Sequence, residues 1–271
     1  MPISFLDRIV AVKQEEIAES SRRMPEAMLR KQAGMPRPKR RFFDMLKAPS
    51  SGHPHVIAEV KRASPSKGLI RPDMDAVAYA KACQEGGATA MSVLTDNRFF
   101  HGSLGDAQSV RDAVDLPVLR KDFLISLYQV YESRAAGLDA ILLIVRILET
   151  SLLNELLALC HELDMDALVE IHSEDDLKSA SLAGAKLIGI NSRDLSTFET
   201  DSTICSRLLP FLEPDQVAVA ASGIRNRADI DRLMPFGVNN FLIGESIARS
   251  PDPKEFVRYL IGRGETVARS Q

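Results

Sequence analysis

Eight short runs of mostly β-branched and other apolar residues recur after residue 54, and a longer segment with helical spacing follows each run. Their positions are 56–60, 89–94, 117–120, 139–145, 166–171, 186–190, 217–222 and 240–244. This alternation predicts a parallel sheet of βα units, because parallel strands need a long crossover between them. Successive runs begin about 26 residues apart on average, which is close to one unit of a closed eight-stranded barrel.

The segments between these runs carry glycines where helices are expected to end. Gly86–Gly87, Gly137, Gly184 and Gly237 each stand just before a predicted strand, where a left-handed cap is needed. An open doubly wound sheet is the alternative, but it normally has fewer strands and a glycine-rich first turn, which does not follow Val60. We therefore expect an α/β fold, a (β/α)8 TIM barrel with an N-terminal helical extension. The predicted domain covers residues 1–271, with the extension at 1–54.

The extension is predicted to be helical from Ile3 to about Leu29, with Arg8, Lys13 and several glutamates between its apolar positions. Residues 34–55 are rich in proline and glycine, so we expect a connecting segment with one short helical turn. The basic residues of this segment suggest a lid that closes over an anionic substrate. They are Arg37, Lys39, Arg40 and Arg41. A stabilising brace is the alternative.

Composition argues for small-molecule chemistry. The 34 basic and 37 acidic residues are interspersed and give a net charge of −3, so we expect no nucleic-acid or membrane partner. Cys83, Cys160 and Cys205 are far apart, which suggests neither a disulfide framework nor a zinc site. The N-terminus mixes charges with apolar residues, unlike a signal peptide. We expect a cytoplasmic protein, a monomer or at most a weak dimer.

Polar residues end most of the predicted strands, where TIM barrels have their active sites. Glu59 and Lys61 end the first run and alternate onto one face, Lys121 follows the third run, and Glu170 ends the fifth. Buried charges are costly, so their convergence indicates a function. We expect the pKa of a lysine here to be lowered enough for a general acid, and a glutamate to accept the returned proton.

Further residues at the strand ends suggest how a substrate would be held. Small-residue turns after the last two runs can bring backbone N–H groups to a phosphate monoester. The predicted phosphate-binding residues are Ser222, Gly223, Gly244 and Glu245. Phe100 and Phe123 flank the same mouth and would suit an aromatic substrate. His172 has no histidine or cysteine at metal-ligand spacing, so we expect it to be a hydrogen-bonded structural residue or a rim residue.

Several segments resemble the indole-3-glycerol-phosphate synthase family of tryptophan biosynthesis. They include IAEVKRASPSKG (57–68), SVLTDNRFFHGSL (92–104), PVLRKDF (117–123), LVEIH (168–172) and LIGINSRDLSTFETD (187–201). The resemblance extends from the N-terminal helix to about Ile247. It implies a TIM-barrel carboxy-lyase without metal or organic cofactor. The implied reaction is the decarboxylating and dehydrating ring closure of 1-(2-carboxyphenylamino)-1-deoxyribulose 5-phosphate.

By this resemblance, Lys121 corresponds to the general acid on the sugar carbonyl and Glu170 to the general base. The groups implied to position the substrate are Glu59, Lys61, Ser64, Asn191 and Arg193. Either Lys61 or Lys121 could protonate the departing hydroxyl. The implied phosphate cradle comprises Ser222, Gly223 and Gly244.

The sequence departs from the family pattern at Ala221, where a glutamate usually precedes the serine-glycine pair. Ser126 and Leu127 also lack the acidic character common in the family. Two alternatives follow. A related isomerase such as phosphoribosylanthranilate isomerase would share the phosphate cradle, but the set Glu59, Lys61 and Lys121 argues against it. A substrate-binding pseudoenzyme or a subunit serving a partner is the other alternative, motivated by Ala221.

Overall fold

The eight predicted strands form one closed barrel in the computed structural model, which describes residues 5–49, 52–194 and 197–264. All neighbouring strands are parallel, and β1 closes the ring by pairing with both β4 and β10. The bounds are β1 (His55–Val60), β4 (Ala90–Leu94), β5 (Val118–Lys121), β6 (Ala140–Ile144), β7 (Asp166–Ile171), β8 (Leu187–Asn191), β9 (Val217–Ala221) and β10 (Asn240–Ile243). Each predicted run agrees with its strand to within one residue at either end.

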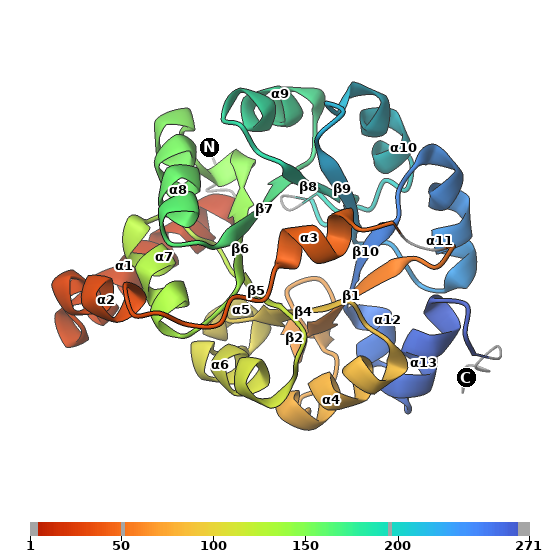
Figure 1. The fold of residues 1–271 in the computed structure, drawn as a ribbon, viewed down its shortest axis with the longest axis horizontal. Coiled ribbons are helices and arrows are strands. Elements are labelled where there is room, and N and C mark those ends of the chain that lie inside the picture. Colours follow the sequence, from red (N-terminus) through yellow and green to blue (C-terminus); the bar gives the residue numbers. More distant parts are fainter. Residues whose placement is uncertain (1–4, 50–51, 195–196, 265–271) are drawn as a thin grey trace.

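A ring of helices surrounds the strands (Figure 1). The helices are α4 (Ala76–Gly86), α5 (Asn97–Phe100), α6 (Leu104–Ala113), α7 (Leu127–Ala135), α8 (Thr150–Glu162), α9 (Glu174–Leu182), α10 (Ile204–Leu208), α11 (Arg227–Leu233), α12 (Glu245–Ala248) and α13 (Pro253–Leu260). At the start of α4, the Asp75 side chain accepts hydrogen bonds from the N–H groups of Val77 and Ala78, and Gly87, one of the predicted glycines, ends this helix at φ 96°. A small hairpin of β2 (Ala63–Ser64) and β3 (Gly68–Leu69) was not predicted.

The barrel has two separate apolar layers. Between helices and strands lies the larger layer, which includes Val56, Met91 and Phe241. Inside the barrel, alternate residues of the same strands, such as Ile57, Leu119 and Leu168, form the second layer. Since these residues fill the interior below the strand ends, only the carboxyl end of the barrel is left for a polar site.

The N-terminal extension forms three helices at two ends of the barrel. The predicted helix is broken at Pro25 into α1 (Phe5–Arg23) and α2 (Glu26–Ala33), because a helix rarely continues through the residue before proline. The predicted short turn is α3 (Phe42–Lys47), which crosses the barrel axis in Figure 1 and buries Phe42 and Leu46 in the interior layer. Thus α3 closes the end of the barrel where the strands begin.

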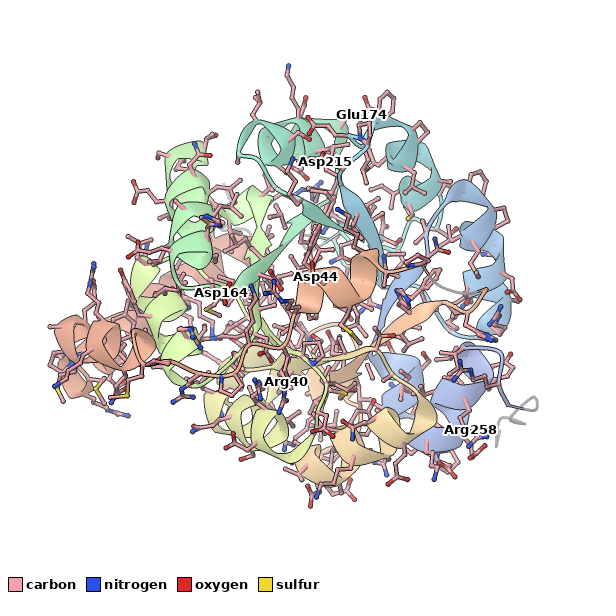
Figure 2. All side chains as sticks on the ribbon, in the orientation of Figure 1. Arg40, Asp44, Asp164, Glu174, Asp215 and Arg258 are labelled. Atoms are coloured by element: carbon pink, nitrogen blue, oxygen red, sulfur yellow. The ribbon has the colours of Figure 1, made fainter. Side chains whose placement is uncertain are left out.

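The basic segment before α3 belongs to this closed end, so the predicted lid is wrong. Lys39 Nζ lies 2.7 Å from a carboxylate oxygen of Asp164, just before β7, and Arg40 donates hydrogen bonds to two backbone carbonyls. Figure 2 shows Arg40 and Asp164 on the face crossed by α3. The cations are therefore bound to strand beginnings, at the opposite end from the strand ends that would hold a substrate.

Candidate active site

A cavity of about 790 Å³ opens at the carboxyl ends of the strands. Most of the predicted site residues line it together: Glu59, Lys61, Ser64, Phe100, Lys121, Asn191, Arg193, Ser222, Gly223, Gly244 and Glu245. Glu170 lies just beneath the floor, bonded to two of these residues. Sequence positions up to 186 residues apart therefore meet in one site because the strands bring their ends to one rim.

Lys121 and Glu170 form a buried pair at the floor of the cavity. The Lys121 ammonium lies 3.5 Å from Glu170 Oε2, and the amide of Asn191 donates a 3.0 Å hydrogen bond to Oε1. Both residues are at strand ends, on β5 and β7, so the barrel itself fixes their backbones. The carboxylate has partners on both oxygens, which orients it toward the lysine.

The expectation that the pKa of Lys121 is lowered is wrong. Burial alone would lower this pKa, but the negative charges of Glu170 and Glu59 outweigh burial and raise it. Conversely, burial would raise the pKa of Glu170, but the charge of Lys121 and the hydrogen bonds from Asn191 and Lys121 lower it. Both groups are consequently charged at neutral pH, so the pair stands ready as an ammonium donor and a carboxylate acceptor.

A second ion pair lies at the mouth of the barrel, at the end of the first strand. Lys61 Nζ lies 3.2 Å from Glu59 Oε1 and 5.6 Å from the centre of the Phe100 ring. A Cβ atom at Gly244 would come within 2.3 Å of Glu59 Oε1, so only glycine leaves room for this carboxylate. The glycine predicted for phosphate binding therefore also makes space for the Glu59–Lys61 pair.

Arg193 lies at the edge of the cavity and contacts residues of three different segments of the chain. Its backbone N–H donates to Asn191 Oδ1, and its guanidinium donates to the hydroxyl of Ser66 at 3.1 Å. Glu245 lies 3.9 Å from the same guanidinium. Ser64 is buried, and its hydroxyl has no hydrogen-bond partner among the described residues although its side chain lines the cavity. The Arg193 guanidinium and the Ser64 side chain are therefore placed to contact a polar substrate.

The predicted phosphate turn has an unusual backbone. Ser222 and Gly223 both have left-handed conformations, with φ of 65° and 77°. They form a tight turn, and backbone N–H groups of a turn can bind an anion. Three cationic residues that the sequence interpretation missed, Lys67, Arg225 and Arg249, line the same cavity. Lys67 belongs to the segment SPSKG after the first strand, whose lysine-glycine end was the available signal.

Aromatic rings form one wall of the cavity. Phe100 lines it, whereas Phe123 is buried behind, with the two ring centres 6.1 Å apart. Phe198 is a lining residue that the sequence did not reveal, since it lies in an irregular loop. Phe5 of α1 packs edge-on against Phe198 at 4.9 Å, so the extension contacts the wall of the cavity.

Two further residues depart from expectation. His172 is buried, but neither ring nitrogen has a hydrogen-bond partner within the described ranges, so the expected hydrogen-bonded histidine is not found. Its Nε2 lies 3.8 Å from Glu170, and burial lowers its pKa, which leaves the ring neutral.

Ala221 lines the cavity at the end of β9, where it offers only a methyl group. Among residues 5–49, 52–194 and 197–264, no group of three or more His, Cys, Asp or Glu residues is placed to hold a metal ion.

The closed βα barrel, with ion-paired lysines and glutamates around a cavity at the strand ends, has the architecture of a TIM-barrel enzyme. The family model described as "Indole-3-glycerol phosphate synthase" matches residues 6–260. The chain therefore belongs to the indole-3-glycerol phosphate synthase family, and it is an enzyme of the carboxy-lyase type, as the sequence predicted.

Relatives of the same name match over nearly the whole chain. The indole-3-glycerol phosphate synthase of Desulfosudis oleivorans is 51% identical over 95% of this chain and 98% of its own length. The protein of Syntrophobacter fumaroxidans is 47% identical, covering 95% and 97%. Among solved structures, 3-hexulose-6-phosphate synthase from Salmonella typhimurium superposes with a TM-score of 0.62 at 10% identity, over 76% of this chain and 96% of its own. This last likeness concerns the fold alone. No helix of the described part of the chain is long and apolar enough to cross a membrane.

Proposed function

We propose that the cavity binds 1-(2-carboxyphenylamino)-1-deoxyribulose 5-phosphate and that Lys121 and Glu170 are its general acid and general base. The observation that carries this assignment is the buried pair at the cavity floor, 3.5 Å apart, with both partners charged. An ammonium can donate a proton to a ketone oxygen, and a neighbouring carboxylate can accept a proton from the same substrate. One pair of side chains can therefore serve both proton transfers.

The proposed reaction has two stages. In the first, Lys121 protonates the sugar carbonyl as the aromatic carbon bonds to it, and the ring carboxylate leaves as carbon dioxide. In the second, the new hydroxyl leaves as water after protonation, and Glu170 removes the ring proton to complete the indole. Lys121 and Lys61 both face the cavity, so either can serve the second stage. Single substitutions of Lys61 and of Lys121, each followed by trapping of the hydroxylated intermediate, show which lysine the second stage requires.

Recognition of the substrate is proposed to be divided around the cavity. Ser222, Gly223, Gly244 and Glu245 would hold the phosphate through backbone N–H groups, supported by Arg249. Lys61 and Arg193 carry positive charge suited to the carboxylate and hydroxyls, with Glu59, Ser64 and Asn191 as hydrogen-bonding partners. Phe100 offers a flat apolar surface to the anthranilate ring, and Phe123 supports it from behind.

A fluorescence assay for indole product tests this proposal. The purified chain, mixed with the carboxyphenylamino substrate, is expected to release indole-3-glycerol phosphate and carbon dioxide. Binding of the substrate without product would favour the pseudoenzyme suggested by Ala221. Isomerisation of phosphoribosylanthranilate without ring closure would favour the isomerase alternative.

We also propose that the protein is a monomer, with a weak dimer at high concentration. We expect no nucleic-acid partner and a cytoplasmic location. The three cysteines are free and buried, which suits a reducing compartment. We also propose that residues 1–54 are an extension of one barrel domain. Sedimentation of the purified chain tests the oligomeric state directly.

A further inference from the structure

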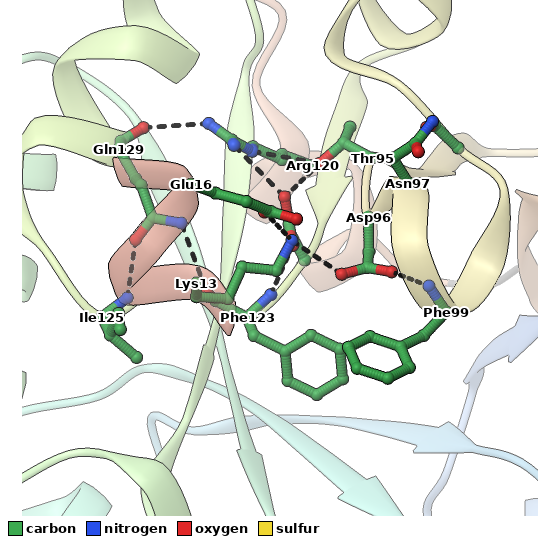
Figure 3. A network of polar contacts seen from close by, with 12 residues as sticks. Lys13, Glu16, Thr95, Asp96, Asn97, Phe99, Arg120, Phe123, Ile125 and Gln129 are labelled. Carbon is green, nitrogen blue, oxygen red and sulfur yellow. Dashed lines mark hydrogen bonds and ion pairs between the residues drawn. The ribbon is translucent and has the colours of Figure 1, made fainter. Parts of the chain in front are cut away.

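Lys13 on α1 is a charged side chain buried against the catalytic end of the barrel. Its exposed fraction is 2%, although the sequence pattern assigned it to the polar side of an amphipathic helix. The ammonium lies 2.7 Å from Asp96 Oδ2 and 3.0 Å from Asp122 Oδ1 (Figure 3). A cation this well buried is retained only where it compensates other buried charge.

The two carboxylates belong to the segments that supply cavity residues. Asp96 caps α5 by accepting a 2.6 Å hydrogen bond from Phe99 N–H, and the next residue of that helix, Phe100, forms the aromatic wall. Asp122 directly follows Lys121 at the end of β5. One ammonium therefore links α1 to both segments, and it does so from outside the cavity, since Lys13 is not among the lining residues.

We propose that Lys13 is a positioning residue for the active site: it holds the ends of β4 and β5 together and so sets the places of Phe100 and Lys121. This inference rests on the proposed function, in which Lys121 is the general acid. Displacement of a reacting group by about 1 Å can cost a factor of about 100 in rate, so even a small relaxation here should reach catalysis.

Removal of the ammonium leaves two buried carboxylates facing each other. Asp122 keeps Arg120 at 3.2 Å and the hydroxyl of Thr95 at 2.6 Å, whereas Oδ2 of Asp96 keeps no partner of its own among the described residues. The other charged groups around the pair are Glu16 of α1, which binds Lys13, and Glu132 of α7, which binds Arg120. Without Lys13, repulsion between the Asp96 and Asp122 carboxylates should therefore push the ends of β4 and β5 apart.

The test uses the full chain and compares lysines at the two ends of the barrel. Lys13→Met is expected to lower kcat about 10- to 100-fold with a change in KM of less than about threefold. Lys39→Met removes an extension lysine bound at the closed end and should leave kcat unchanged.

A second variant keeps the test decisive if Lys13→Met does not fold. Lys13→Met/Asp96→Asn removes the repulsion while asparagine still caps α5, and its kcat should exceed that of Lys13→Met. Wild-type kcat in a folded Lys13→Met protein would overturn the positioning role. So would a double variant with the same low kcat as the single one. Full activity of Lys121→Ala would instead overturn the proposed general acid.

Discussion

The two ends of the barrel use the same kinds of side chain in different ways. At the closed end, Lys39 is bound to Asp164, and the ring of Phe42 fills the barrel interior. At the open end, Lys61 and Lys121 are paired with glutamates but also face a cavity of about 790 Å³. The charge of Lys39 at the closed end fixes the extension to the barrel, whereas the charges of Lys61 and Lys121 at the open end are available to a ligand.

This difference separates stability from activity. A side chain of the closed end should change the free energy of unfolding and leave the chemistry alone, whereas a side chain that lines the cavity at the open end should mainly change the chemistry. Such a division is common in TIM barrels, where the strand beginnings serve stability and the strand ends serve catalysis. Paired substitutions at the two ends test this division.

The largest effect is expected at the cavity floor. Lys121→Ala and Glu170→Gln should each lower kcat by about 100- to 10,000-fold, with much smaller changes in KM, because each removes a proton-transfer group. Steady-state kinetics with indole fluorescence measures both constants. Circular dichroism serves as the control for folding, and near-normal turnover in a folded variant would remove that residue from its role.

The closed end should respond in the opposite sense. Phe42→Ala removes a fully buried ring and should lower the free energy of unfolding by about 3–5 kcal/mol, with kcat unchanged below the melting range. Phe211→Ala, at an exposed phenylalanine, is the matched control and should change stability by less than about 0.5 kcal/mol. Urea unfolding monitors both variants. A large loss of kcat in folded Phe42→Ala would show that the two ends are coupled.

The strands and the strand-end residues were predictable because both follow local rules. Apolar runs, capping side chains and glycines before strands mark each unit, and Glu59, Lys121 and Glu170 stand where the runs end. The sequence position of a strand end therefore already implies a place at the mouth. What local rules could not supply was the sign of the pKa shift of Lys121, which depends on the distance to a carboxylate 49 residues away.

The extension was predicted less well for a related reason. Two of its lysines have partners far along the chain: Lys13 pairs with Asp122, and Lys39 pairs with Asp164. Periodicity alone treated them as solvated. One signal was present: Lys13 lies four residues after Ile9 and four before Ile17, on the apolar side of α1. The break at Pro25 was likewise visible in the sequence.

The ion pairs of the open end should also appear in the acid stability of the protein. Burial alone would raise the pKa of Asp122, but Arg120 and Lys13 lower it from 3.8 to about 2. A lowered pKa contributes stability that is complete above the ordinary value and is lost as pH falls through the folded value. The contribution of roughly 2 kcal/mol should therefore disappear between about pH 4 and pH 2.

Asp122→Asn isolates this effect. Urea unfolding at a series of pH values should give a difference between wild type and variant that is largest near neutral pH and narrows toward pH 2. Asp215→Asn provides the comparison, because Asp215 is an exposed residue with a surface ion pair. A difference for Asp122→Asn that does not vary with pH would contradict the sign of the shift.

The smallest expected effect compares two left-handed glycines, one at each end. Gly223 has φ 77° in the proposed phosphate turn, and a Cβ there would lie 3.2 Å from Thr200 Cγ2, so Gly223→Ala must shift this turn. A non-glycine residue in this conformation costs about 1–2 kcal/mol, and we expect KM for the phosphorylated substrate to rise about tenfold. Inhibition by inorganic phosphate should weaken in parallel.

Gly237 has φ 93° before β10 at the closed end, with open space around its Cβ position. Gly237→Ala should therefore lower stability by a similar amount and leave KM unchanged, and equal KM values for the two variants would exclude the proposed phosphate cradle.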